Sequence, residues 1–204
     1  MKTKDLVLIS ILTALATIIM FIEIPNPIAP FLKLDLSDVV VLVAFAIYGW
    51  KGAGLVGVLK ALIHALIKGP DMYSAIPYLG TFVAIFASLT IVLAFCVSTN
   101  RLKLNKIITF GVVVSTLTVV LTVVNYYIVT PAYFGWPTVS LAEVKGMFTG
   151  FLNWDTGGTF DPTKGYLMAV LFAYVPFNII KGSIIMGIYY TVERSLANKL
   201  KELR

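Results

Sequence analysis

The chain has 204 residues, of which 59% are hydrophobic and only 13% are charged. A soluble domain carries roughly 25% charged residues, so a soluble globule of this composition would lack the polar groups to cover its surface. The mean hydropathy of +0.92 indicates instead a protein whose solvent is lipid. Apolar helices of about 20 residues use nearly all of the length, which excludes a separate soluble catalytic domain.

The net charge of +6 does not indicate a nucleic-acid ligand. The basic residues are dispersed at the ends of apolar runs, where they orient membrane proteins. The single cysteine, Cys96, lies within an apolar run and has no second thiol with which to form a disulfide or a metal cluster. We therefore expect Cys96 to be a small buried residue, and we expect neither a metal site nor a cofactor.

The apolar runs predict an all-α membrane protein, a single-domain bundle of six transmembrane helices. The first run is too long for the core of a signal peptide. Because Glu23 and Pro25 follow it in place of a small-residue cleavage site, we expect it to be retained as a helix. The six predicted spans are Leu6–Ile24, Val39–Trp50, Ala53–Ile67, Tyr78–Val97, Ile107–Thr130 and Tyr166–Val192.

Proline, glycine and charged residues set the segments between the spans. Three prolines between residues 25 and 30 break the chain after the first span and lead into an extended loop. Lys51 and Gly52 predict a tight turn between the second and third spans. Residues 131–165 contain glycine, proline and aromatic anchors, and we expect them to form a long extracellular loop that is a candidate lid.

Positive charge is divided unevenly between the two sides of the predicted bundle. With the amino terminus inside, ten lysine and arginine residues fall on the inner side and four on the outer side. An excess of positive charge marks the cytoplasmic side, so we predict that both termini lie inside, as an even number of spans requires. The inner residues are Lys2, Lys4, Lys51, Arg101, Lys103, Lys106, Arg194, Lys199, Lys201 and Arg204, and the outer residues are Lys33, Lys68, Lys145 and Lys164.

Three polar residues within the predicted spans call for an explanation, because a lysine at the centre of a membrane costs about 2.5–3.5 kcal/mol. Asn178 and Lys181 are three residues apart and share one face of the sixth span. Pro176 favours a kink or a break just before them, and a broken helix at membrane depth usually lines a cavity. Asn125, near the outer end of the fifth span, is placed to approach the same cavity.

These three side chains suit a neutral, planar heteroaromatic ligand. Amides both donate and accept hydrogen bonds and lysine donates, which matches carbonyl groups and ring nitrogens. The alternative is an interhelical clamp, in which the asparagines hold neighbouring helices together.

Lys60 and His64 are four residues apart in the third span and form a second polar pair. The chain has no other histidine, so a metal site is disfavoured, and the nearness of His64 to the outer end favours an interfacial residue. Lys60 is placed to form an ion pair with Asp38 or with Asp35, and such a pair either fixes the helices or contributes to a site.

Two pairs of small residues recur at four-residue spacing. Ser10 and Ala14 lie in the first span, and Ala61 and Ala65 lie in the third. Such pairs permit close helix approach, either within the bundle or against a partner protein, and both readings stay open.

Several expected signals of other functions are missing from the sequence. It contains no G-x-x-x-x-G-K-[ST] phosphate loop, no H-E-x-x-H and no G-x-S-x-G. No inverted repeat of the spans is evident, which disfavours a carrier that works alone by alternating access.

The chain resembles the riboflavin-binding S components, of the RibU type, of energy-coupling factor (ECF) transporters. The resemblance covers most of the chain, and its most specific part is an Asn-x-x-Lys motif that follows Pro-Phe. The matching residues are Leu34-Asp35-Leu36-Ser37-Asp38, Lys60, Asn125-Tyr126-Tyr127 with Pro131, and Pro176-Phe177-Asn178-Ile179-Ile180-Lys181-Gly182.

This resemblance implies a binder of riboflavin in a prokaryotic plasma membrane, with Asn125, Asn178 and Lys181 holding the isoalloxazine ring. It also implies partners, namely a transmembrane coupling subunit and two ATPase subunits, with Ser10 and Ala14 as the docking candidates on the first helix. Further candidates for ligand or loop contacts are Asp35, Ser37, Asp38 and Lys60.

The chain departs from the family pattern at Ser10, where alanine is usual, and at Gly146–Lys164, which resembles an insertion that forms either an extra lid or a surface ornament. Three other functions stay open: an S component for a different vitamin, a stand-alone secondary transporter, and an intramembrane enzyme with Lys60 or His64 as a base. The preference between riboflavin and its phosphate is also open.

Overall fold

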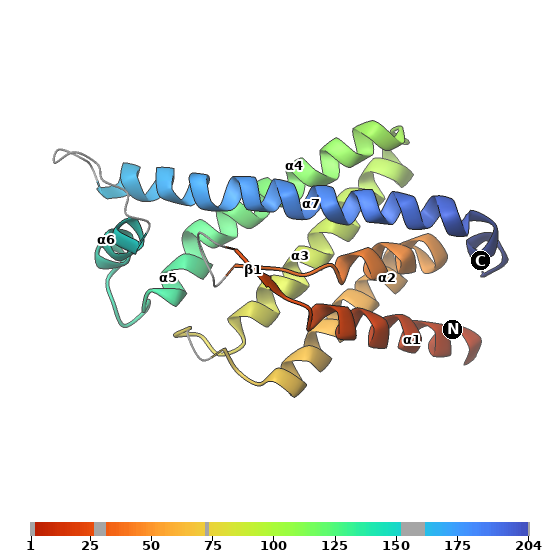
Figure 1. The fold of residues 1–204 in the computed structure, drawn as a ribbon, viewed down its shortest axis with the longest axis horizontal. Coiled ribbons are helices and arrows are strands. Elements are labelled where there is room, and N and C mark those ends of the chain that lie inside the picture. Colours follow the sequence, from red (N-terminus) through yellow and green to blue (C-terminus); the bar gives the residue numbers. More distant parts are fainter. Residues whose placement is uncertain (1–2, 27–31, 72–73, 152–161, 204) are drawn as a thin grey trace.

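The computed structural model describes residues 3–26, 32–71, 74–151 and 162–203 as a bundle of helices (Figure 1). Among these residues, five helical segments are long and apolar enough to cross a membrane, so the chain is a multi-pass membrane protein. The elements are α1 (Thr3–Met20), β1 (Ile24–Pro25), β2 (Lys33–Leu34), α2 (Asp38–Lys68), α3 (Leu79–Cys96), the π-helical turn η1 (Val97–Arg101), α4 (Lys106–Val124), the π-helical turn η2 (Asn125–Val129), α5 (Thr130–Tyr133), α6 (Leu141–Phe151) and α7 (Pro162–Leu203).

Helix α2 doubles back on itself at Gly49. This residue has φ 70° and ψ −166°, a conformation open almost only to glycine. In a straight helix Asp38 and Lys60 would lie about 33 Å apart, yet Lys60 Nζ is 2.6 Å from Asp38 Oδ1. The helix therefore consists of two antiparallel arms, residues 38–48 and 50–68, which correspond to the second and third predicted spans.

The turn predicted at Lys51 and Gly52 is wrong, because both residues are helical and the chain reverses earlier, at Gly49. Gly52 has a different part in the turn. A Cβ atom at this position would lie 2.3 Å from the Cβ of Tyr48, so only glycine lets the chain pass so close. Gly49 supplies the unusual backbone conformation and Gly52 supplies the space.

The predicted long loop 131–165 is partly helical. Helix α4 continues through η2 into α5, which has Pro131 near its start and ends at Tyr133. Helix α6 follows and packs on α7, with Val144 fully buried. Of the predicted insertion, the part from 152 to 161 lies outside the described residues.

Helix α7 is the longest element, and it runs without a break through Pro176 (Figure 1). Of the two outcomes expected at this proline, a break is therefore wrong. Helix α7 begins at Pro162, earlier than the predicted span, and extends past the predicted end into the basic tail. It packs against α2, α4 and α6, so it contacts much of the bundle.

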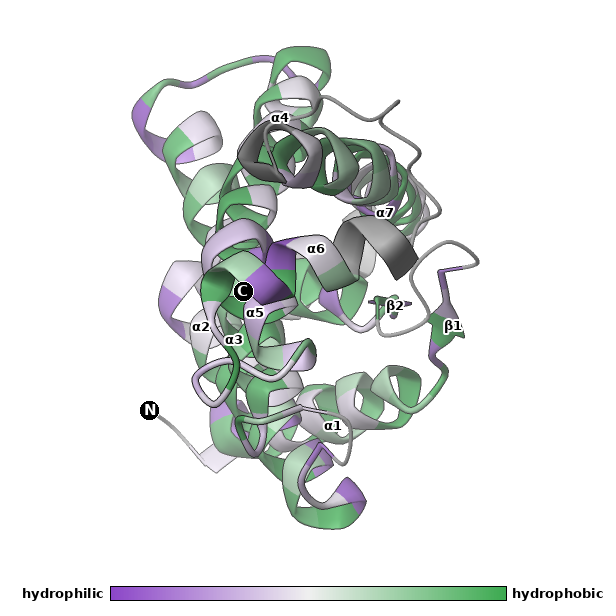
Figure 2. Cartoon of the chain, turned by 90° about the vertical axis from the view of Figure 1, so that its left-hand side faces the viewer, coloured by the Kyte–Doolittle hydropathy of each residue, from purple (hydrophilic) through white to green (hydrophobic). Residues whose placement is uncertain are grey.

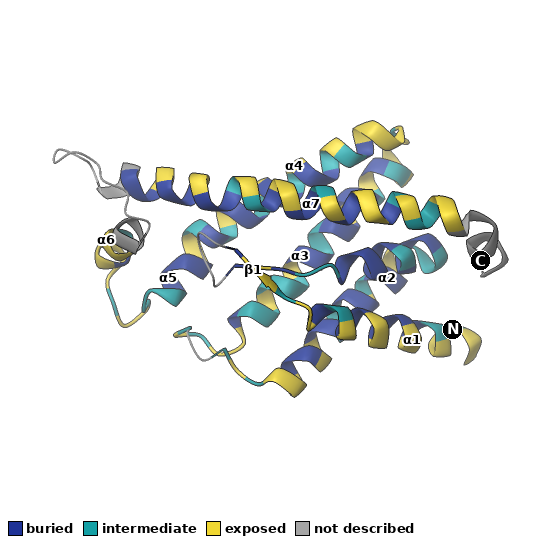
Figure 3. Ribbon diagram, viewed as in Figure 1, coloured by how far each residue is buried: buried dark blue, intermediate teal, exposed yellow. Residues whose placement is uncertain are grey.

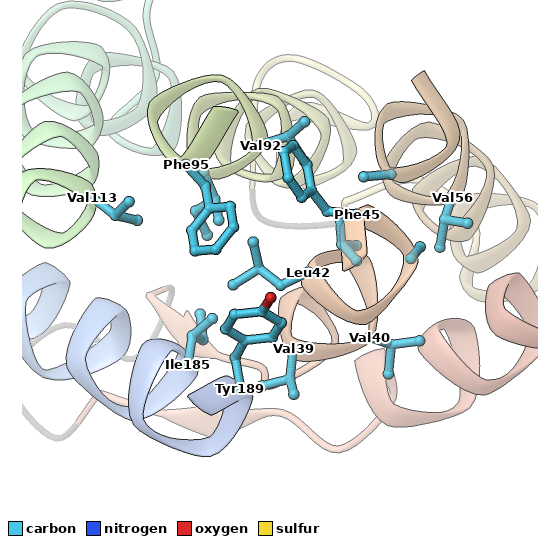
Figure 4. Close-up of a cluster of buried hydrophobic side chains, with 14 of the residues drawn as sticks. Val39, Val40, Leu42, Phe45, Val56, Val92, Phe95, Val113, Ile185 and Tyr189 are labelled. Atoms are coloured by element: carbon cyan, nitrogen blue, oxygen red, sulfur yellow. The ribbon is translucent and has the colours of Figure 1, made fainter. Parts of the chain in front are cut away.

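The apolar core lies beside the carboxyl-terminal half of α7 (Figure 4). Phe95 of α3 packs edge-on between Phe45 of α2 and Tyr189 of α7, with ring centroids 5.1 Å and 5.3 Å away. Leu42 fills the space between these rings and Ile185. Cys96 is partly buried against this core, close to its expected place. The core fixes the relative positions of α2, α3, α4 and α7, and these helices continue into the region of the cavity described below.

Large apolar side chains also cover the outside of the bundle. Figure 3 shows exposed residues along α1 and α7, and Figure 2 shows that most of the helical surface is hydrophobic. Ile18 and Ile22 are 64% and 66% exposed, and Phe82 of α3 is 64% exposed. Such a surface suits contact with lipid chains. The start of α1 and the end of α7 lie at the same end of the bundle (Figure 1).

Candidate functional site

A cavity of about 760 Å³ lies between the loop that follows α1, the second arm of α2, α3, the end of α4 and α7. This volume falls within the range of roughly 300–1,000 Å³ that is typical of small-molecule sites. Most of the wall is apolar, and a few polar side chains interrupt it. The residues singled out from the sequence that line the cavity are Asp35, His64, Asn125, Asn178 and Lys181.

An ion pair joins two of these residues across the base of the cavity. Lys181 Nζ of α7 lies 3.2 Å from Asp35 Oδ2 in the loop before α2. Asp35 Oδ1 also accepts hydrogen bonds from the hydroxyl and, at 3.1 Å, from the backbone N–H of Ser37. Burial alone would raise the pKa of Asp35, but Lys181, Lys60 and the Ser37 hydroxyl outweigh it and hold that pKa below its ordinary value.

The two asparagines present unsatisfied polar atoms. Asn125 is 3% exposed, and its Nδ2 donates to the Leu121 carbonyl at 2.7 Å, while its Oδ1 has no partner among the described residues. Asn178 is 2% exposed, and its Nδ2 likewise has no partner there. A buried polar atom left unpaired costs about 1–3 kcal/mol. The two asparagines thus hold one acceptor and one donor that are unpaired among the described residues.

This arrangement bears on the alternative in which the asparagines clamp helices together. The Asn125 amide donates within its own helix, and the Asn178 Nδ2 reaches no other helix in the described part of the chain. Asn125 also opens η2, a wide π-helical turn of a kind that is frequent at functional sites. These atoms therefore do not form an interhelical clamp.

A buried polar cluster lies behind the cavity rather than on its wall. Lys60 is 1% exposed, and its Nζ donates at 2.6 Å both to Ser37 Oγ and to Asp38 Oδ1. Ser88 Oγ of α3 donates to the same Asp38 oxygen at 2.5 Å. Of the two partners expected for Lys60, the ion pair is with Asp38. Ser37, Asp38 and Lys60, which were candidates for ligand contacts, do not line the cavity.

Sequence reasoning missed an ionic cluster at the outer rim of the cavity. Glu23 accepts from Lys33 at 2.5 Å and from Lys68 at 2.6 Å, which ties the loop after α1 to the end of α2. Burial would raise the pKa of Glu23, but the two lysines lower it below its ordinary value. The spacing of Lys60, His64 and Lys68, four residues apart on one helix face, was the signal available for this rim.

His64 is a buried residue of the cavity wall. It is 5% exposed and lines the cavity. Its ring packs against that of Phe21, with 4.5 Å between the two ring centroids. In the described part of the chain, no group of three or more histidine, cysteine or acidic side chains is placed to hold a metal ion.

The two pairs of small residues differ in exposure. This difference distinguishes packing within the bundle from contact with a partner protein. Ala61 and Ala65 are 0% and 8% exposed, so both lie inside the bundle, and Ala65 also lines the cavity. Ser10 and Ala14 lie on the exposed side of α1, and Ser10 Oγ donates to the Leu6 carbonyl at 2.9 Å. The Ser10 hydroxyl is therefore satisfied within its own helix, and the small notch on α1 stays open to another surface.

Charges on the cavity wall cancel among the residues that the structure describes. Three carboxylates and three ammonium groups line it, together with the imidazole of His64 and the phenol of Tyr133. The carboxylates are Glu23, Asp35 and Asp71, and the ammonium groups are Lys33, Lys68 and Lys181. A wall without net charge favours a ligand without net charge.

Comparison with known proteins places the chain in one family. Residues 4–193 match the family described as "ECF transporter, substrate-specific component". The fold is similar to that of a solved protein reported as "Structure and mechanism of the S component of a bacterial ECF transporter", with a TM-score of 0.71 and 26% identity. That similarity covers 98% of this chain and 99% of the solved chain.

Two curated relatives are similar over nearly their whole length. The riboflavin transporter RibU of Staphylococcus aureus (strain TCH60) is 29% identical over 206 residues, covering 99% of this chain and 95% of that protein. The riboflavin transporter FmnP of Bacillus subtilis (strain 168) is 26% identical over 192 residues, covering 93% of this chain and 90% of that protein.

Proposed function

From the premise that the chain belongs to the substrate-specific components of ECF transporters, we propose that it binds riboflavin and delivers it for uptake into the cytoplasm. The family is one of transporter components, so the chain is not an enzyme, and the reading of Lys60 or His64 as an enzymatic base is wrong. The relatives named as riboflavin transporters support the choice of ligand. The observation that carries the proposal is the set of free polar atoms in the cavity.

The isoalloxazine ring matches that set atom by atom. Its pyrimidine edge carries a ring N–H donor between two carbonyl acceptors, and further ring nitrogens accept hydrogen bonds. Asn125 Oδ1 is a free acceptor for the N–H, and Asn178 Nδ2 is a free donor for a carbonyl. The Lys181 ammonium donates in several directions, so it is able to hold a second acceptor of the ring while it keeps Asp35. Binding then removes the cost of the unpaired atoms.

The hairpin in α2 supports a proposed membrane topology. We place both arms of α2 in the membrane, which gives six crossings with both termini in the cytoplasm of a prokaryotic cell, across its plasma membrane. The shared end of α1 and α7 supports an even number of crossings (Figure 1). Arg101, between α3 and α4, lies on the inner side in this topology. A cysteine at Arg101 that reacts with a membrane-impermeant thiol reagent in intact cells would contradict it.

The energy for uptake comes from partners, because the chain has no phosphate loop of its own. We propose that it assembles with a transmembrane coupling subunit and two ATPase subunits, and that the notch at Ser10 and Ala14 receives the coupling subunit. Ala14→Leu fills this exposed notch without touching the cavity. We expect it to abolish co-purification with the coupling subunit and to leave riboflavin affinity unchanged; retained co-purification would contradict the docking site.

Residues 131–165, with α6 and the Gly146–Lys164 segment, are the proposed outer cover of the cavity. The packing of α6 on α7 supports this position, since α7 carries Asn178 and Lys181. Deleting the segment and measuring the dissociation rate of riboflavin tests the role. A lid predicts faster release, whereas a surface ornament predicts no change.

The direct test of the ligand is the identity of the small molecule that co-purifies with the protein. We expect a yellow preparation whose extracted ligand has the absorbance spectrum of a flavin. Extraction of thiamine, biotin or another vitamin would support an S component of different specificity. Uptake of riboflavin by cells that lack the coupling ATPases would support a secondary transporter that works alone.

A further inference from the structure

His64 presents a polar atom that neither the fold nor the ring site uses. Only 5% of its surface is exposed, and the residue lines the cavity. Its Nε2 has no hydrogen-bond partner in the described part of the chain. Packing against Phe21 satisfies only the apolar face of the ring. A histidine kept solely for packing would leave a cost of about 1–3 kcal/mol unrecovered.

The surroundings of His64 place it in the outer part of the cavity. Lys60, one turn before it, is held in the buried cluster with Asp38, while Lys68, one turn after it, is 35% exposed at the rim. Successive turns of a helix are about 5.4 Å apart, so His64 stands between the buried cluster and the rim. It faces the cavity from α2, whereas Asn178 and Lys181 face it from α7.

A carboxylate completes this second polar position. Glu23 Oε1 lies 3.9 Å from His64 Nε2, too far for a direct hydrogen bond. Glu23 is itself held by Lys33 and Lys68, so its carboxylate is fixed at the rim and remains ionised. The imidazole nitrogen and the fixed carboxylate are close enough for one ligand group to bond to both.

We propose that His64 and Glu23 form a subsite for vicinal hydroxyl groups, and that it binds the polyhydroxylated chain that riboflavin carries on its ring. This inference rests on the proposed function, because it requires the ring to lie at Asn125, Asn178 and Lys181. Each hydroxyl donates only one hydrogen bond, so one hydroxyl donates to the Glu23 carboxylate. The same hydroxyl accepts from His64 Nε2 when that nitrogen carries the proton, and its vicinal neighbour donates to Nε2 when it does not. Lys33 and Lys68 balance the negative charge of Glu23, which suits an uncharged polyhydroxylated group.

The experiment compares two flavins that share the ring and differ in the chain. Riboflavin carries the polyhydroxylated chain, and lumiflavin has a methyl group in its place. Dissociation constants of both are measured by quenching of flavin fluorescence on the full-length protein in detergent. His64→Leu is expected to weaken riboflavin about tenfold, as the loss of a hydrogen bond in a closed site predicts, and to leave lumiflavin within about twofold.

Two further variants separate a ligand contact from a packing role. His64→Gln keeps a polar nitrogen in reach of the chain and is expected to restore much of the riboflavin affinity. Glu23→Gln, which lies at the rim and outside the helices, is expected to weaken riboflavin several-fold and to spare lumiflavin. If His64→Leu does not fold, the riboflavin and lumiflavin affinities of Glu23→Gln test the subsite in its place.

Asn178→Leu is the matched control, because it acts on the ring and should weaken both flavins equally. Equal losses for the two flavins in the His64 and Glu23 variants, or no loss in either, would overturn the subsite. Failure of the wild-type protein to bind either flavin would overturn the proposed function itself, so the two failures are distinguishable.

Discussion

At the scale of single residues, the buried pair of Lys60 and Asp38 is the most consequential contact outside the cavity. Both side chains are almost completely buried, at 1% and 2% exposure, and they join the two arms of α2. Two charges removed from water are tolerated only when each satisfies the other. The contact with Ser88 extends the pair to α3.

Lys60→Met tests this contact. The substitution leaves the Asp38 carboxylate buried without its cation, and we expect it to lower the free energy of unfolding by about 3–5 kcal/mol. Thermal unfolding in detergent measures the change. Lys68→Met is the matched control, because Lys68 also pairs with a carboxylate but is 35% exposed, so its loss should cost at most about 1 kcal/mol. Equal effects of the two substitutions would contradict the assigned burial.

At the scale of elements, the reversal within α2 depends on Gly49. Its backbone angles lie in a region that other residues occupy only at a cost of about 1–3 kcal/mol. No atom lies within 4 Å of the position that a Cβ would take there, so space does not limit a substitution. The cost of replacing Gly49 is therefore one of backbone conformation alone.

Gly49→Ala is expected to destabilise the protein by about 1–3 kcal/mol through this backbone cost. Gly111→Ala is the control, since that position in α4 also has open space around it but lies in ordinary helical backbone. There alanine should be neutral or should stabilise the helix by up to about 1 kcal/mol. A melting temperature that is unchanged in Gly49→Ala would contradict the proposed hairpin geometry.

The elements also show what the sequence can and cannot predict. Hydropathy located the apolar stretches that form the five long helical segments of the described residues, because lipid exposure acts on whole segments and needs no knowledge of neighbours. It misplaced the turn in α2, since Gly49 and Gly52 are both glycines and only tertiary packing decides which one reverses the chain. Helix α6 was missed because Val144, its buried anchor among the described side chains, packs in a helix whose partner is α7, a distant part of the chain.

The residues of the candidate site also fall into those that the sequence could predict and those that it could not. Asn178 and Lys181 were predictable because a polar residue in an apolar span is costly wherever it points. The rim formed by Glu23, Lys33 and Lys68 was not, since charged residues near a helix end are ordinary. Only the fold brings the loop after α1 against the end of α2 and turns these charges toward a cavity.

At the scale of the whole molecule, the balanced charges of the cavity predict a preference for riboflavin over its phosphate. The phosphate brings a charge of about −1.5 to −2 at neutral pH into a wall without net charge. We expect riboflavin to bind at least about tenfold more tightly than its phosphate when the two are titrated in parallel. Asp71→Asn removes one wall carboxylate and should narrow this ratio; tighter binding of the phosphate by the wild-type protein would contradict the charge argument.

The molecule combines a lipid-exposed bundle, an apolar core at one end and a polar cavity toward the other. The core holds α2, α3, α4 and α7 in fixed positions, and the cavity uses the same helices to bring distant polar residues together. As a substrate-specific component of an ECF transporter, the chain is one component of a larger transporter.

The measurement that tests the central claim most directly is a riboflavin titration of the purified protein beside Asn125→Leu, Asn178→Leu and Lys181→Met. We predict tight one-to-one binding by the wild-type protein and a loss of affinity of about tenfold or more in each variant, because each removes a hydrogen bond to the ring. Circular dichroism confirms that each variant is folded. Folded variants that bind riboflavin as tightly as the wild-type protein would show that the cavity described here is not the riboflavin site.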